Sequence, residues 1–232
     1  MTETNPSPRR LVSARAPIPV RLADQPKAAG MVVPFLTLAH RDRSGPVWGK
    51  LDPARLQSTL LHKLCQICGD PLGERVVVYI RPSDYLRGIA VEPGMHPECG
   101  LYSRRVCPML AGHVHRYNPH PREKFTRCDD AVCGCRYWIP ADPDPRDGTR
   151  EGQPAQAWYE AWLHVNDYVI VSDPGSENTA PVVGIELRPA SRIRRLRKVR
   201  DAAPGSEDDQ PIDVLAAIIA TRAIFGAGGQ LR

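Results

Sequence analysis

Hydrophobic positions recur along the first half of the chain with helical and strand periods, and they predict short elements. Asp52-Pro53 is a typical helix start, and leucines follow it at fourfold spacing, so we expect a helix over 53–63. The β-branched run at 76–80 predicts a strand, with residues 88–92 returning as its hairpin partner. A second short helix is expected over 98–106.

The second half shows the same mixture of periods. We expect a short helix over 158–162, a strand over 168–171, and a half-buried partner strand over 182–188 in which apolar and charged residues alternate. A final helix should begin at Pro211. The apolar run at 31–39 contains a proline, which suits a short edge strand.

Composition explains why such short elements need a further source of stability. The 232 residues include 24 prolines and only 6% aromatic residues, so burial alone supplies a small core. No apolar run approaches the roughly 20 residues that span a bilayer, and residues 11–19 are too rich in proline and arginine for a secretion signal. We therefore expect a cytoplasmic protein without a membrane partner, whose seven cysteines stay reduced and whose clustered cysteines bind metal.

The strongest chemical signal is two pairs of metal ligands, each separated by two residues. Cys65 and Cys68 precede Gly69, which can adopt a left-handed turn, so this pair is expected in a knuckle. His96 and Cys99 open a predicted helix, where free N–H groups favour thiolates. Zinc takes four nitrogen or sulfur ligands in a tetrahedron, and such a closed site has no position for a catalytic water. The sequence therefore predicts a structural zinc site made by these four residues.

The order of knuckle, hairpin and ligand-bearing helix resembles a treble-clef zinc finger over residues 64–108. The chain also resembles a group of uncharacterised small bacterial and phage zinc-binding proteins in its strings Cys-x2-Cys-Gly-x-Pro-Leu-Gly, Pro-Gly-Met-His-x2-Cys-x2-Tyr and Cys-Pro-x-Leu. These resemblances imply a metal site and no particular activity.

A second thiol cluster follows downstream. Cys128, Cys133 and Cys135 need one more ligand to close a zinc site. In the resembling group the Cys-Pro element occurs without this cluster, which favours a histidine as that ligand. Thiols without a metal, or a disulfide, are the alternatives. The candidates for the fourth ligand are His113, His115, His120 and Cys107.

Basic residues concentrate between 188 and 200, where seven cations occur in 13 residues without one acid. We call this segment the basic strip. Phosphates neutralised by such a strip release counterions, so nucleic acid is the expected partner. An acidic protein could take the same place, or the strip could surround a segment that Ile193, Leu196 and Val199 anchor. The candidate nucleic-acid contacts are Arg192, Arg194, Arg195, Arg197, Lys198 and Arg200.

One enzymatic alternative concerns His113, His115, Asn118 and His120. This set resembles that of the histidine-asparagine-histidine nucleases, some of which are built on treble clefs. Here the set follows the predicted helix and lies in a loop, so the geometry of that family is missing. A degenerate metal-dependent nuclease is the alternative to a protein without catalytic activity, which is our expectation.

These patterns predict an α+β fold with a zinc-stabilised treble-clef core, short antiparallel strands and a C-terminal helix. The expected function is that of a zinc-binding nucleic-acid-binding or adaptor module. The expected order along the chain is a disordered arm over 1–30, a zinc-binding domain over 31–139, an irregular linker over 140–154, a β-hairpin subdomain with the basic strip over 155–200, and an acidic linker with a helix over 201–232.

Overall fold

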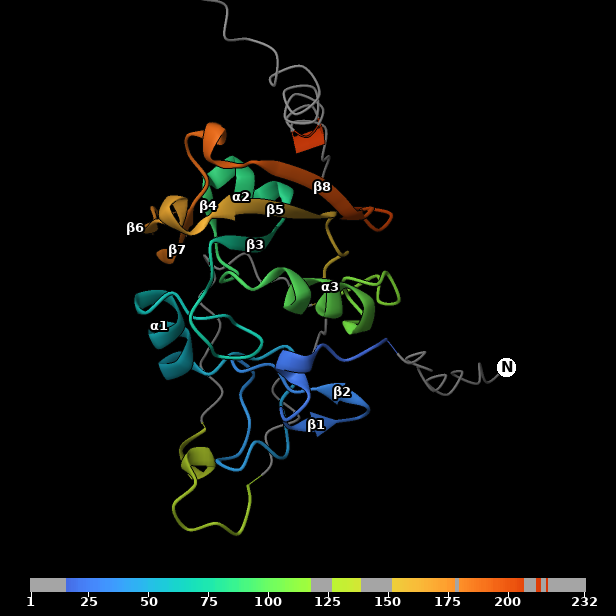
Figure 1. Cartoon of the computed structure of the whole chain (residues 1–232), viewed down its shortest axis with the longest axis vertical. Helices are drawn as coiled ribbons and strands as arrows, with labels where there is room; N and C mark the ends of the chain where they lie inside the picture. The colour runs from blue at the N-terminus through green and yellow to red at the C-terminus, as the bar shows by residue number, and fades with distance from the viewer. Residues whose placement is uncertain are drawn as a thin grey trace, which may run out of the picture.

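A computed structural model describes residues 16–117, 127–138, 152–177, 180–206, 212, 213 and 216. These residues form a mixed α+β structure with two three-stranded antiparallel sheets and one two-stranded ribbon (Figure 1). Its α-helices are α1 (Pro53–Leu61), α2 (Pro82–Arg87) and α3 (Pro97–Val106). Its strands are β1 (Lys27–Ala28), β2 (Met31–Val32), β3 (Arg75–Ile80), β4 (Ile89–Ala90), β5 (Trp158–His164), β6 (Ile170–Asp173), β7 (Val182–Glu186) and β8 (Arg195–Arg200).

Helix α1 begins where the sequence predicts because Asp52 caps it. The Asp52 carboxylate accepts hydrogen bonds from the amides of Ala54 at 3.0 Å and Arg55 at 3.1 Å, which satisfies N–H groups that have no partner inside the helix. Leu60 on its apolar face is buried in a hydrophobic core. The expected helix over 53–63 is therefore present, ending two residues earlier.

Strand β3 separates two hydrophobic cores. Val76, Val78 and Ile80 pack into a first core between the two larger sheets, together with residues of β5, β7 and β8. Val77 and Tyr79 point to the opposite face and pack into a second core with residues 65–68 and α3. Because successive side chains of a strand alternate between faces, one strand connects both cores.

The expected hairpin between 76–80 and 88–92 does not form. Strand β3 pairs with β5, and β4 pairs with β7, each in antiparallel register. Helix α2, which we did not predict, redirects the chain between β3 and β4. Its signals were Pro82 at the first turn and Gly88 in a left-handed conformation after the last turn.

The helix predicted over 158–162 is wrong, because these residues belong to β5. Tyr159, Ala161 and Leu163 lie in the first core, while Trp158 lies in the second. This alternation is a strand pattern, and β3 and β8 pair with both edges of β5. Pairing with strands on both sides outweighs the helical preference that the sequence of residues 158–162 suggests.

The expected strands over 168–171 and 182–188 are present as the hairpin β6–β7, shifted by two residues at its start. The edge strand expected over 31–39 is reduced to β2, which pairs with β1. The C-terminal helix falls largely outside the described residues, and none is established among them. Of that segment, Ile212 is buried in the first core.

Part of the segment 16–30, which the sequence assigned to a disordered arm, packs onto the second core. Leu22 is fully buried there, within a 3-10 turn at Val20–Leu22. The sheet β3-β5-β8 combines strands from both sides of the expected linker over 140–154, of which only residues 152–154 are described. The division into domains stays a prediction.

Candidate metal centre

A tight turn holds Cys65 and Cys68, the first pair of candidate ligands. The Cys65 amide donates to the Asp70 carbonyl at 2.7 Å, and the Gly69 amide donates to the Cys65 carbonyl at 2.8 Å. Gly69 has φ +84°, a left-handed conformation that glycine adopts without strain. The expected knuckle is therefore present, and both of its thiols are buried.

Helix α3 supplies the second pair. His96 is the N-cap residue of the helix, and Cys99 lies in its first turn. Met95, directly before His96, exchanges two backbone hydrogen bonds of 2.9 Å with Val77 of β3. This bridge fixes the start of α3 against the sheet, so that the histidine and the cysteine meet the knuckle.

The four side chains converge on one point. Their ligand atoms lie within 4.8 Å of one another, and all four residues are buried. Cys68 Sγ lies 3.4 Å from His96 Nδ1, and tetrahedral zinc with ordinary bond lengths would separate such atoms by about 3.6 Å. The Nε2 atom of His96 lies 2.9 Å from the Pro71 carbonyl oxygen, a partner that orients a ligating imidazole. This Cys3His group can hold a metal ion such as zinc.

Neighbouring sulfurs shift the pKa of Cys65 and the pKa of Cys99 in opposite directions. Burial opposes ionisation of Cys65, but the sulfurs of Cys68 and Cys99 and nearby amides outweigh burial and lower the pKa of Cys65. Contacts with the Cys65 and Cys68 sulfurs raise the pKa of Cys99. The Cys68 contact also raises the pKa of His96. Neighbouring thiols ionise together only beside a compensating cation, which a divalent metal provides.

Arg21 connects the two halves of the centre from outside. Its guanidinium lies 2.9 Å from the Asp70 carboxylate, at the end of the knuckle, and 2.9 Å from the Glu98 carboxylate, between the two ligands of α3. Hydrogen bonds with Glu98 and then Asp70 raise the pKa of Arg21. Sequence reasoning missed this contact because it placed Arg21 in a disordered arm.

The second predicted thiol cluster lies on the segment 127–138. Cys133 and Cys135 are buried, and Cys128 is partly buried. His40 joins them: one of its ring nitrogens and the sulfurs of Cys128 and Cys135 lie within 4.8 Å of one another. His40 lies far upstream without a ligand-like spacing, so no sequence signal pointed to it.

The other candidates for a fourth ligand lie elsewhere. His113 and His115 are exposed after α3, and Cys107 packs against the second core. His120, like Asn118 of the nuclease-like set, lies outside the described residues. Within the described part of the chain, the structure thus brings His40 to the thiols, and not Cys107, His113 or His115.

The basic strip is largely engaged within the molecule. Arg197 Nη2 lies 3.0 Å from both carboxylate oxygens of Glu160, which is almost fully buried. Arg200 Nη1 donates to the Met109 and Val114 carbonyls at 2.7 Å. Further partners are Asp213 for Lys198 at 2.8 Å, Asp167 for Arg194 at 3.6 Å, Glu186 for Arg192, and the Trp162 ring for the exposed Arg195 at 5.9 Å.

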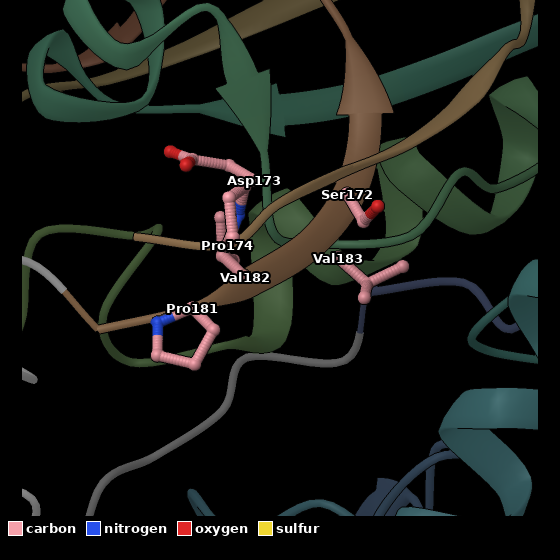
Figure 2. A pocket seen from close by; sticks show the side chains of 6 residues that line it. All are labelled: Ser172, Asp173, Pro174, Pro181, Val182 and Val183. Carbon is pink, nitrogen blue, oxygen red and sulfur yellow. The ribbon is translucent and has the colours of Figure 1, made fainter. Parts of the chain in front are cut away.

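A hollow of about 240 Å³ lies at the β6–β7 hairpin (Figure 2). Asp173, its one charged lining residue, pairs with Arg87 at 2.8 Å and caps the Gly175 amide. No ligand of the metal centre lines the hollow, and its walls carry no catalytic constellation. The lining residues are Ser172, Asp173, Pro174, Pro181, Val182 and Val183.

Among the described residues, no helix combines the length and the apolar character needed to cross a membrane. No protein-family model, curated protein or solved structure matches the chain. Function is therefore inferred from the metal centre itself.

Proposed function

We propose that this protein is a zinc-binding module in which Cys65, Cys68, His96 and Cys99 hold one zinc ion in a structural role. The observation that carries the proposal is the convergence of four buried ligand atoms, two from a knuckle and two from a helix start. Three sulfurs and one imidazole nitrogen are a donor set that selects zinc over magnesium or calcium, which prefer oxygen.

A structural role follows from the number and burial of these ligands. Four protein ligands complete a tetrahedron, so no coordination position is left for a water or a substrate. His96 is 5% exposed, and the three cysteines are buried as well. The same cysteines are members of the second hydrophobic core. The ion would therefore stabilise that core, and the module would act through its surface.

The arrangement supports a treble-clef-like module with a modified hairpin. The knuckle and the ligand-bearing helix match the pattern that the sequence suggested. The bridge between Val77 and Met95 occupies the place of the hairpin, while β3 continues into a sheet with β5. We propose that a zinc finger of this type has been incorporated into a larger sheet.

For the partner we retain nucleic acid as the proposal and an acidic protein as the alternative. The chain has a net charge of +5, and the exposed Arg195 projects from the edge strand β8. The carboxylates already paired with Arg192, Arg194, Arg197 and Lys198 reduce the charge that the basic strip can offer. Binding is therefore expected to be weak, with a salt dependence that reflects only the few phosphate contacts still available.

Metal analysis of the full chain, purified under reducing conditions without a chelator, tests the zinc proposal. Cys99→Ser should lose one equivalent of zinc relative to the unmodified chain. Cys107→Ser is the matched control, because this cysteine also lies beside the second core yet outside the four-ligand group, and it should retain all its zinc. Less than half an equivalent in the unmodified chain, or full retention by Cys99→Ser, would contradict the proposal.

A further inference from the structure

Two buried cysteines on the segment 127–138 belong to neither hydrophobic core of the described residues. Cys133 and Cys135 are 2% and 3% exposed, yet neither belongs to the first or the second core. Their neighbours Val132 and Tyr137 are each 74% exposed. In Figure 1 this yellow-green segment lies at the lower end of the molecule, beside the blue N-terminal part of the chain. Contacts of these thiols join Cys135 to Cys128 and Cys133 to Arg41.

The distances within this cluster suit a metal ion. Cys128 Sγ lies 3.6 Å from Cys135 Sγ, close to the separation of about 3.8 Å between two sulfurs on tetrahedral zinc. A disulfide would instead hold them about 2.05 Å apart. A ring nitrogen of His40 lies within 4.8 Å of both sulfurs. Three potential ligands therefore already surround one point.

Cys133, whose sulfur is not among the three atoms that lie within 4.8 Å of one another, is contacted by the residue next to His40. The Arg41 amide donates to Cys133 Sγ at 3.4 Å, and the Cys128 amide donates to Cys135 Sγ at 3.3 Å. Amide donors of this kind stabilise thiolates, which are the form that binds metal. The Arg41 guanidinium also pairs with Asp130 at 2.9 Å, so two contacts hold the cysteine segment against residues 40 and 41.

The ring of His40 is positioned from three sides. It stacks on Trp138 with centroids 5.4 Å apart and an interplanar angle of 18°, and its Nδ1 lies 3.4 Å from Ser44 Oγ. A Cβ atom at position 45 would lie 2.6 Å from the ring, so Gly45 leaves the space that the ring occupies. Partners that orient a ligating imidazole are a usual part of zinc sites.

We infer that His40, Cys128, Cys133 and Cys135 hold a second zinc ion, which joins the segment 127–138 to the loop around residue 40. This site is independent of the centre in the second core, because the two share no residue. Its role would be to fix an otherwise weakly attached segment, since a metal that links distant parts of a chain removes conformational freedom from the unfolded state.

Two substitutions of His40 and one control substitution test whether His40 acts as a ligand. The unmodified chain should contain two equivalents of zinc when purified under reducing conditions. His40→Phe keeps an aromatic ring on Trp138 but has no ligand atom, and it should lose one equivalent. His40→Cys gives up the stacking but supplies a thiolate, and it should retain two. His113→Ala is the control for a histidine outside the cluster and should also retain two.

Alkylation of thiols shows which of the two sites has lost its zinc ion. In His40→Phe, the peptide carrying Cys128, Cys133 and Cys135 should react with iodoacetamide, while Cys65, Cys68 and Cys99 stay protected. A single zinc in the unmodified chain that His40→Phe leaves in place, or a Cys128–Cys135 disulfide under reducing conditions, would overturn the inference. Loss of zinc in both His40→Phe and His40→Cys would show that the ring serves packing and would also overturn it. If the first centre held no zinc, Cys99→Ser would leave the zinc content unchanged, while His40→Phe would still lose one equivalent. The proposal for the first centre and the proposal for the His40 site can therefore fail separately.

Discussion

Glu160 illustrates how single residues of the basic strip are committed to the fold. Its side chain is 4% exposed on the central strand β5, and it accepts a hydrogen bond from Trp162 Nε1 at 2.7 Å. Arg197 and Arg104 supply the positive charge beside it, at 3.0 and 3.5 Å. A buried carboxylate is tolerated only with such partners. Arg197 therefore neutralises Glu160 within the sheet, and this pairing limits its availability to a binding partner.

At the residue scale we predict that Arg197→Gln and Arg195→Gln differ in stability. Arg197→Gln leaves Glu160 short of its closest cation, so the free energy of unfolding should fall by about 1 to 3 kcal/mol. Arg195→Gln removes an exposed cation from the face of Trp162 and should cost about 0.5 to 1 kcal/mol. Urea denaturation of both variants measures the difference, and equal stabilities would contradict this role for Arg197.

The variant Arg195→Gln also tests the contribution of this arginine to binding. If nucleic acid is the partner, Arg195→Gln should lower the slope of log affinity against log salt by about one unit, as one lost phosphate contact does. An unaltered slope would assign the exposed arginine to a solvated edge.

At the scale of elements, the knuckle depends on Gly69. Its φ of +84° lies in the left-handed region, and a Cβ atom there would lie 2.8 Å from the ring of Phe35. The Phe35 amide donates a hydrogen bond of 2.9 Å to the Ile67 carbonyl, which lies inside the knuckle. A side chain at position 69 therefore disturbs both the turn and the segment packed on it.

We predict that Gly69→Ala lowers the free energy of unfolding by about 1 to 2 kcal/mol, the cost of a left-handed alanine, and weakens zinc retention against a competing chelator. Gly73→Ala is the matched control, because no atom lies within 4 Å of its Cβ position. The control should stay within about 0.5 kcal/mol of the unmodified chain. Equal zinc retention by the two variants would show that the turn does not position the ligands.

Elements also show where sequence reasoning succeeds. Asp52 and Pro53 are local signals for α1, and the Cys-x2-Cys-Gly string is a local signal for the knuckle; both features are present. The strand β5 and the pairing of β3 were misjudged, because they depend on neighbours distant in sequence. No pattern within a short window states which strand will occupy the edge of another.

At the scale of the whole molecule, strand β3 connects the candidate metal centre to the sheet β3-β5-β8. Val77 of β3 bridges to Met95 beside the ligand His96, while Val76 and Val78 face the first core. Structural zinc in small modules contributes roughly 10 to 16 kcal/mol of apparent binding free energy, as much as the whole stability of a typical domain. A zinc ion held by the four ligands would therefore stabilise the second core to which its three cysteines belong.

We predict that complete zinc removal unfolds the second core before the β6–β7 hairpin, which packs against the first core. Hydrogen exchange of the full chain, with and without a chelator, measures this directly. Amides of α3 and of residues 65–72 should lose protection most, with β3 next. Unchanged protection in these segments after the metal is gone would contradict a structural role.

The sequence by itself determined the features whose causes lie within a few residues. These are a capped helix, a glycine turn, and two pairs of potential ligands at the spacing typical of a knuckle and of a helix start. Tertiary structure alone decided the partner of β3, the burial of Glu160 beneath the basic strip, and the approach of His40 to Cys128 and Cys135. The physical reason is that local conformation depends on neighbouring backbone and side chains. Contacts between distant segments depend instead on how the whole chain buries its apolar surface and compensates its charges.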